Sequence, residues 1–186
     1  MKFRTLIFSL IALSFLATLF ADPAIPPANP PQKISGANQY DAVTLDVIDG
    51  TGLVKLNGTT VSNIHLTGSL ITQNAHIGTL NIIGEANLKN TVVEQGGSVL
   101  GSLQATHSTF RNAITILSQK AVFTGSRLEG ITVQKDSGFK GKQVLELRQG
   151  TLINGPIHFE SGKGEVLIFP GCQVLGPVTG GKVVKK

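Results

Sequence analysis

The feature that most constrains this chain is a short glycine motif that recurs between Leu56 and Val178. Each copy contains an apolar residue, any residue, glycine, one or two further residues, and then another small or apolar residue. Glycine adopts positive φ without steric cost, so each copy can end a short strand and turn the chain into the next one. We call this sequence the corner motif, and its predicted structural corner glycines are Gly58, Gly68, Gly84, Gly101, Gly125, Gly141, Gly155, Gly171 and Gly176.

The spacing of the corner motif indicates a repeat protein. From Leu66 onward the leading apolar residues stand at positions 66, 82, 99, 123, 139, 153 and 169, with one longer interval between Val99 and Phe123. Repetition at a nearly fixed period is typical of solenoids, in which each repeat packs only on its neighbours. We interpret the longer interval as a coil with an added corner or a loop.

Short alternations of apolar and polar residues lie between the glycines and predict strands with one face inward. They occupy residues 43–47, 53–56, 64–66, 114–116, 131–133, 144–147 and 157–159. Helical periodicity is missing after the predicted export signal described below, and 22 glycines disfavour long helices. The sequence therefore predicts an all-β fold, a single-stranded β-helix over residues 43–180 with six to eight coils of about 16 to 20 residues.

The two ends of the chain differ from this pattern. Residues 1–21 combine Lys2 and Arg4 with an apolar stretch, which predicts a signal peptide and therefore export to the periplasm, the cell envelope or the medium. Leu19 matches the usual cleavage pattern poorly, so an uncleaved membrane anchor stays open. Residues 22–42 contain five of the eight prolines and predict a semi-rigid spacer, and residues 181–186 form a basic tail.

Two segments resemble a known family. Residues 92–105, VVEQGGSVLGSLQA, and their echo in residues 131–141, ITVQKDSGFKG, are similar to the coil signature of bactofilins, which are polymer-forming bacterial cytoskeletal proteins. The resemblance covers roughly residues 53–178. It implies a right-handed triangular β-helix that polymerises end to end without a nucleotide. Bactofilins are typically cytosolic, whereas this chain begins with a predicted export signal.

Residues capable of metal binding are scattered. The four histidines, His65, His76, His107 and His158, belong to no metal motif, and the alternation around His65 and His158 predicts that both point outward. A surface metal site made by stacking of distant histidines is the alternative. Residues 46–52, DVIDGTG, resemble part of a calcium loop, but the ligand spacing fails and we predict an Asp49-Gly50 turn. The sequence thus predicts no cofactor and no metal.

Catalytic and nucleic-acid functions find little support. Acidic residues occur about one per coil, and neither a nucleophile elbow nor a phosphate-binding loop is present. We therefore expect no enzyme activity, although stacking could still bring two carboxylates together. Without Lys2 and Arg4 the chain has 14 basic and 11 acidic residues and no tryptophan, which is a poor composition for binding nucleic acid. Cys172, the only cysteine, stands where Thr, Ser or Ala occurs in other motifs, which predicts a small filler, with intermolecular pairing as the alternative.

Two functions follow as hypotheses. The first is a non-enzymatic structural role at the cell envelope, with self-association through the end coils, residues 43–47 and 174–184, because uncapped strands pair with other chains. The second is a secreted or surface binding module that presents a polar face to a glycan, peptidoglycan or a host partner. Its candidate outward residues are Thr59, Thr60, Asn63, Asn90 and Asn112.

Overall fold

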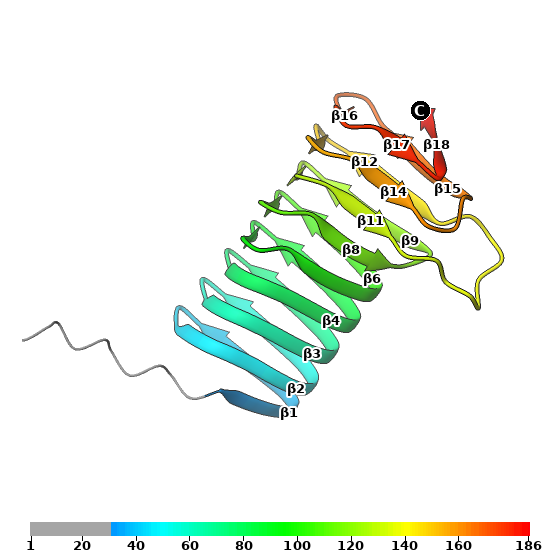
Figure 1. Cartoon of the computed structure of the whole chain (residues 1–186). Coiled ribbons are helices and arrows are strands. Elements are labelled where there is room, and N and C mark those ends of the chain that lie inside the picture. Colours follow the sequence, from blue (N-terminus) through cyan, green and yellow to red (C-terminus); the bar gives the residue numbers. More distant parts are fainter. Residues whose placement is uncertain (1–30) are drawn as a thin grey trace, which may run out of the picture.

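The structure is a computed structural model that describes residues 31–186, so the predicted signal peptide and residues 22–30 of the predicted spacer lie outside the described residues. Within residues 31–186 every regular element is a β-strand, and eighteen strands form one wound sheet with parallel pairing throughout. Figure 1 shows the coils stacked from β1 at one end to β18 at the other. The predicted all-β solenoid is confirmed.

The first coils contain long strands that continue around bends. They are β1 (Gln32–Asp41), β2 (Thr44–Asn57), β3 (Thr60–Gln73) and β4 (His76–Lys89). Neighbouring strands pair in a constant register, so that Ile48 lies beside Ile64 and Ile64 beside Leu80. The length of these coils lies within the predicted range.

The later coils are divided into shorter strands. These are β5 (Val92–Val93), β6 (Gly97–Thr106), β7 (Thr109–Phe110), β8 (Ile114–Leu117), β9 (Lys120–Thr124), β10 (Arg127–Leu128), β11 (Ile131–Val133), β12 (Val144–Arg148), β13 (Leu152–Ile153), β14 (Ile157–Phe159), β15 (Gly164–Ile168), β16 (Gln173–Val174), β17 (Val178–Thr179) and β18 (Gly181–Lys185).

The stack has three sides. The first side contains β5, β7, β10, β13 and β16, the second contains β8, β11, β14 and β17, and the third contains β9, β12, β15 and β18. β2, β3 and β4 each continue onto all three sides, whereas β1 continues onto the second and third sides only. Along the third side nine strands lie side by side, from β1 to β18, so the described chain makes about nine coils rather than the predicted six to eight.

The core is a column of inward-facing apolar side chains. In the strands alternate residues are buried, as in β3 and β8, because successive side chains point to opposite faces of a sheet. The largest buried side chains are Phe110, Phe123 and Phe159, and the rings of Phe110 and Phe123 meet edge to face with centroids 6.1 Å apart. Stacking of like residues therefore fills the interior without a second layer.

The corner-motif glycines occupy three different corners and a loop. Gly68, Gly84 and Gly101 stack between the second and third sides, with φ of 140°, 135° and 139°. A Cβ on Gly84 would overlap the carbonyl oxygen of Gly68, so this corner requires glycine. The other glycines lie at the corner between the third and first sides (Gly58, Gly125 and Gly171), at the corner between the first and second sides (Gly155 and Gly176), and in the loop of residues 134–143 (Gly141).

This division explains the long interval that we interpreted as an added corner or a loop. Val99 pairs with Ile116 on the second side, whereas Phe123 lies on the third side beside Leu147. The motifs at Val99 and Phe123 therefore mark different corners, and no corner is added between them.

Both predicted boundaries of the solenoid differ from the structure. β1 falls within residues 22–42, which we predicted to be a spacer, because prolines stop at Pro31 and residues 32–41 pair in register with residues 48–57. At the other end β18 pairs with β15, so residues 181–186 belong to the last coil rather than to a tail. The stack therefore covers nearly all of residues 32–186.

One segment leaves the stack. Residues 134–143 connect β11 to β12 and project as the long loop in Figure 1. The coil that contains this loop is longer than the others, since Leu145 pairs back to Ala121. Gln143 closes the base of the loop, where its Nε2 donates to the carbonyl oxygens of Ser118 at 3.2 Å and Gln134 at 2.7 Å. The sequence did not predict this loop.

A row of small side chains, buried except for the partly buried Cys172, runs along the corner between the third and first sides. Its members, one per coil, are Thr59, Ala75, Thr91, Ser108, Ser126, Thr151 and Cys172. Most of the hydroxyl groups accept from the backbone N–H of the preceding member, as Ser126 Oγ does from Ser108 N at 3.1 Å, and donate to a carbonyl oxygen in their own or a neighbouring coil. We call this the hydroxyl row, and Cys172 takes its last position.

Candidate functional site

The predicted histidine positions form no shared site. His65 and His158 are both exposed on the second side, but four other positions of the same row separate them. His158 Nδ1 lies 2.8 Å from Thr179 Oγ1, and His76 Nε2 lies 2.9 Å from Glu94 Oε1. His107 lies in the corner between the third and first sides, with φ of 49°. Among residues 31–186 no group of three or more His, Cys, Asp or Glu could hold a metal ion.

The predicted Asp49-Gly50 turn is wrong. β2 runs without a break from Thr44 to Asn57, and Asp49 and Gly50 pair with residues of both β1 and β3. The chain bends inside this strand because Gly50 and Gly52 have φ of 148° and 129°, a change of direction that leaves the ladder intact. The two glycines of this segment therefore serve the bend.

The candidate polar residues do not share one surface. Thr59 is buried in the hydroxyl row, where its Oγ1 donates to the carbonyl oxygen of Tyr40 or of Asn57. Asn90 lies at a corner and donates to Asn74, and Asn112 lies at another corner and donates to the carbonyl oxygen of Glu94. Since these residues are on different sides, the stack does not gather them into one binding face.

A continuous polar row that the sequence analysis missed does run along the second side. Its members are Lys33, Asp49, His65, Asn81, Ser98, Thr115, Thr132, His158 and Thr179. Within it Ser98 Oγ donates to Asn81 Oδ1 at 3.0 Å. Finding this row from sequence would have required the register of every coil, including the later coils whose lengths differ from those of the first ones.

The most buried carboxylate also has a local role. Glu146 on β12 accepts hydrogen bonds from Lys120 at 2.6 Å and from Arg148, whose guanidinium carbon lies 5.3 Å from the centre of the Phe169 ring. Burial raises the pKa of the Glu146 carboxyl group, but the hydrogen bonds and charges of Lys120 and Arg148 outweigh burial, so this pKa lies below its ordinary value. The group is therefore an ionised partner of two cations rather than a proton donor.

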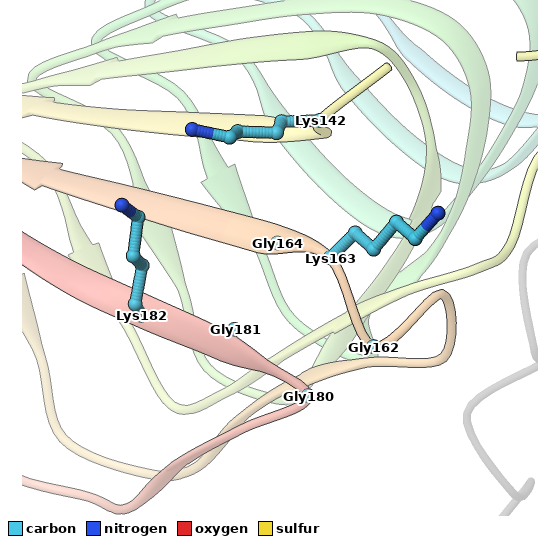
Figure 2. Close-up of a pocket in the computed structure, with 7 residues that line it drawn as sticks. All are labelled: Lys142, Gly162, Lys163, Gly164, Gly180, Gly181 and Lys182. Carbon is cyan, nitrogen blue, oxygen red and sulfur yellow. The ribbon is translucent and has the colours of Figure 1, made fainter. Parts of the chain in front are cut away.

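Figure 2 shows a lysine-rich cavity of about 540 Å³ beside β15 and β18. Lys142 and Lys182 extend toward the same side and both pair with Glu165, at 3.4 Å and 3.9 Å, while Lys163 extends away from them. The three ammonium groups therefore do not converge on one point, and a carboxylate already lies between two of them. The cavity lacks the focused positive charge that an anion site needs.

The end of the stack at the last coil is hollow and mainly apolar, and Gln173 and Lys185 also line it. A cavity of about 660 Å³ is lined by residues of this coil, among them Cys172, Val174, Val178 and Val183. Val183 is 44% exposed, whereas Val166, at the same position one coil earlier, is fully buried. Leu175, also at this end, is 66% exposed. We call this surface the tail end.

The first coil forms the opposite end. β1 pairs with β2 along one edge, and no other strand within residues 31–186 pairs with its second edge. Its inward side chains include Ile34 and the half-buried Tyr40, and Val43 beside it is 40% exposed. We call this surface the head end. The prediction of the N-terminal end coil was therefore wrong, because the first coil of the described chain contains β1 and not residues 43–47.

Residues 31–186 contain no helix of the length and hydropathy that crossing a membrane requires. In comparisons with known proteins, no family model, no curated protein and no solved structure matched this chain.

Proposed function

We propose that this chain is an exported, non-enzymatic structural protein that self-assembles through the two ends of its solenoid. The observation that carries the proposal is the tail end, where core positions such as Val183 and Val178 line an open hollow instead of a closed core. An apolar surface of this kind favours a partner that covers it.

Backbone pairing supports the same function. A terminal strand of a parallel stack has N–H and C=O groups directed away from the stack, and such an edge pairs readily with another strand. A second copy provides a strand of matching shape at each end, and repeated stacking of this type builds a rod. The resemblance to bactofilins, which polymerise end to end, agrees with this proposal.

The proposed site of action is outside the cytoplasm, in the periplasm, at the cell envelope or in the medium. Its support is the predicted signal peptide, residues 1–21. A rod that assembles from its ends needs neither a nucleotide nor a cofactor, so export to a compartment without nucleotides would not hinder its assembly.

The test is assembly of the purified protein, measured by light scattering over a concentration series and by electron microscopy. We expect rods that lengthen with concentration, and we expect Leu175→Ser to shorten them because it removes exposed apolar surface at the tail end. Ile83→Ser is the matched control, since Ile83 is 57% exposed but lies on the side of the stack. A monomer at all concentrations, or equal effects of both substitutions, would contradict the proposal.

The polar row on the second side supports a second candidate function, a binding module for a glycan or peptidoglycan. Nine hydrogen-bonding side chains follow one another at the rung spacing of about 4.8 Å, which suits an extended ligand. Binding to cell-wall sacculi and to a glycan array tests this function. We expect retention that falls when Asn81 and Thr115 are replaced by Ala; no enrichment on either material would rule the function out.

A further inference from the structure

We infer that assembly is polar, with the tail end of one copy stacked on the head end of the next copy. This inference rests on the proposed function and adds to it the orientation of the two partners. The inference follows from the register of the third side, where each row of side chains has one residue at the head end and one at the tail end.

Side chains at the two ends can be matched because every row on the third side runs the length of the stack. Within residues 31–186, following the pairings from strand to strand, one outward row begins at Asp41 and ends at Lys186, whose backbone N–H donates to the carbonyl oxygen of Ile168 at 3.0 Å. The neighbouring inward row begins at Tyr40 and ends at Lys185. Continuing the stack with a second copy therefore places Lys186 beside Asp41 and Lys185 beside Tyr40.

These neighbours are complementary. Adjacent strands lie about 4.8 Å apart, so Lys186 and Asp41 of the next copy come within ion-pair distance. Lys185 occupies an inward position, where an ammonium group is costly to bury without a partner. The phenol of Tyr40 can supply that partner, through its ring face or its oxygen.

Charge along the chain has the same polarity. Residues 134–186 contain eight basic and four acidic residues, whereas residues 32–133 contain six of each. The last coil, residues 173–186, has three lysines and no acidic residue. The tail end is thus the positive end of the rod.

The two symmetric arrangements fit less well. Tail against tail would run two copies of β18 antiparallel and bring Lys182 of one copy near Lys185 or Lys186 of the other, and like charges in opposed positions destabilise a sheet. Head against head would pair Lys33 with Asp41, but it would produce a closed dimer that leaves both tail ends uncovered. Only the polar arrangement covers every hollow and continues the parallel ladder.

Disulfide trapping tests the orientation. Gln39 and Val184 are the first and last members of one outward row, so the polar arrangement places their Cα atoms at the separation that a disulfide accepts. Both variants are made in the full chain with Cys172→Ser, which removes the native thiol and introduces serine, a residue that the hydroxyl row already contains. On oxidation we expect a mixture of the Gln39→Cys and Val184→Cys variants to form disulfide-linked dimers. Each variant alone should stay uncrosslinked.

Charge reversal supplies a second test, and it leaves Gln39 and Val184 unchanged. Lys186→Glu and Asp41→Lys are each expected to weaken association about tenfold at low salt, and the double variant is expected to return to within about twofold of the unchanged chain. Dimers of either cysteine variant alone, or no recovery in the double variant, would overturn the polar orientation while rods still form. Absence of any assembly in the Cys172→Ser chain and in the unchanged chain would overturn the proposed function together with this inference.

Discussion

The hydroxyl row makes a quantitative prediction about stability, and Thr151 is its best test. Thr151 is fully buried, and its Oγ1 accepts from the backbone N–H of Ser126 at 3.3 Å. The same oxygen donates to the carbonyl oxygen of Arg148 at 2.7 Å or of Phe123 at 2.9 Å. Thr151→Val keeps the shape of the side chain but replaces this oxygen by a methyl group, so the substitution isolates the hydrogen bonds.

The expected cost comes from the N–H of Ser126. This group is buried, and Thr151 is its only hydrogen-bond partner within the described residues, so Thr151→Val leaves it unsatisfied. An orphaned buried donor costs about 1 to 3 kcal/mol, and the added methyl group recovers a small part of that. We therefore expect a loss of about 2 kcal/mol in the free energy of unfolding, or a melting temperature lower by roughly 4 to 8 °C for a chain of this size.

Urea denaturation followed by circular dichroism measures the change as a shift of the midpoint, with Thr60→Val as the matched control. Thr60 is exposed on the first side, so we expect that control to stay within about 0.5 kcal/mol of the unchanged chain. Since solenoids unfold by neighbouring repeats, equal slopes of the transitions must be verified before midpoints are compared. If Thr151→Val and Thr60→Val have the same midpoint, the hydroxyl row does not contribute as we argue.

Three further substitutions test other features. Gly84→Ala is expected to lower the free energy of unfolding in urea by more than about 3 kcal/mol, because its Cβ would overlap a backbone oxygen one coil earlier. The control Gly162→Ala, which has open space at its Cβ, should lower it by about 1 kcal/mol. Similar losses in the two variants would refute the packing argument. Glu146→Gln is expected to lower the free energy of unfolding by about 1 kcal/mol at pH 7. Because the pKa of Glu146 is lowered in the folded state, this loss of stability should persist at pH values above the ordinary pKa of 4.5 and vanish as the pH falls through the folded pKa. A loss of stability that grows on acidification would contradict this reasoning. Val183→Asp is expected to shorten or abolish rods in light scattering without changing the free energy of unfolding in urea by more than about 1 kcal/mol, since Val183 already lies at the open end. Unchanged rods would argue against the tail end as a contact.

The solenoid could be predicted from the sequence because its signals are local. An apolar residue on each side of a central glycine and a nearly regular period are both visible in the chain, and the seven predicted strand segments lie almost entirely in strands of the structure. The register was not visible, because Gly84 and Gly125 have the same motif but turn the chain at different corners. Counting from motifs that lie at different corners gives about the right average coil length. It does not give the correct pairing of residues between neighbouring coils.

The candidate surfaces needed that alignment. Asp41 and Lys186 are 145 positions apart in the sequence, and only a chain of pairings through nine strands places them in one row. The loop of residues 134–143 shifts this row by several residues, and no local signal gives its size. Thr59 was expected outward for the same reason, since alternation alone does not say which residue follows a corner inward.

The direction of the ladder hydrogen bonds has a mechanical consequence. In a solenoid these bonds lie along the axis of the rod, so a pull applied to the two ends of the chain loads the outermost coil alone rather than the whole stack at once. Each of the first coils releases 16 residues when it opens, and the longest coil, which contains the loop, releases 24, or roughly 50 to 80 Å of extended chain. Such a molecule yields under tension in many small steps of similar force, which makes it an extensible element and not a rigid tie.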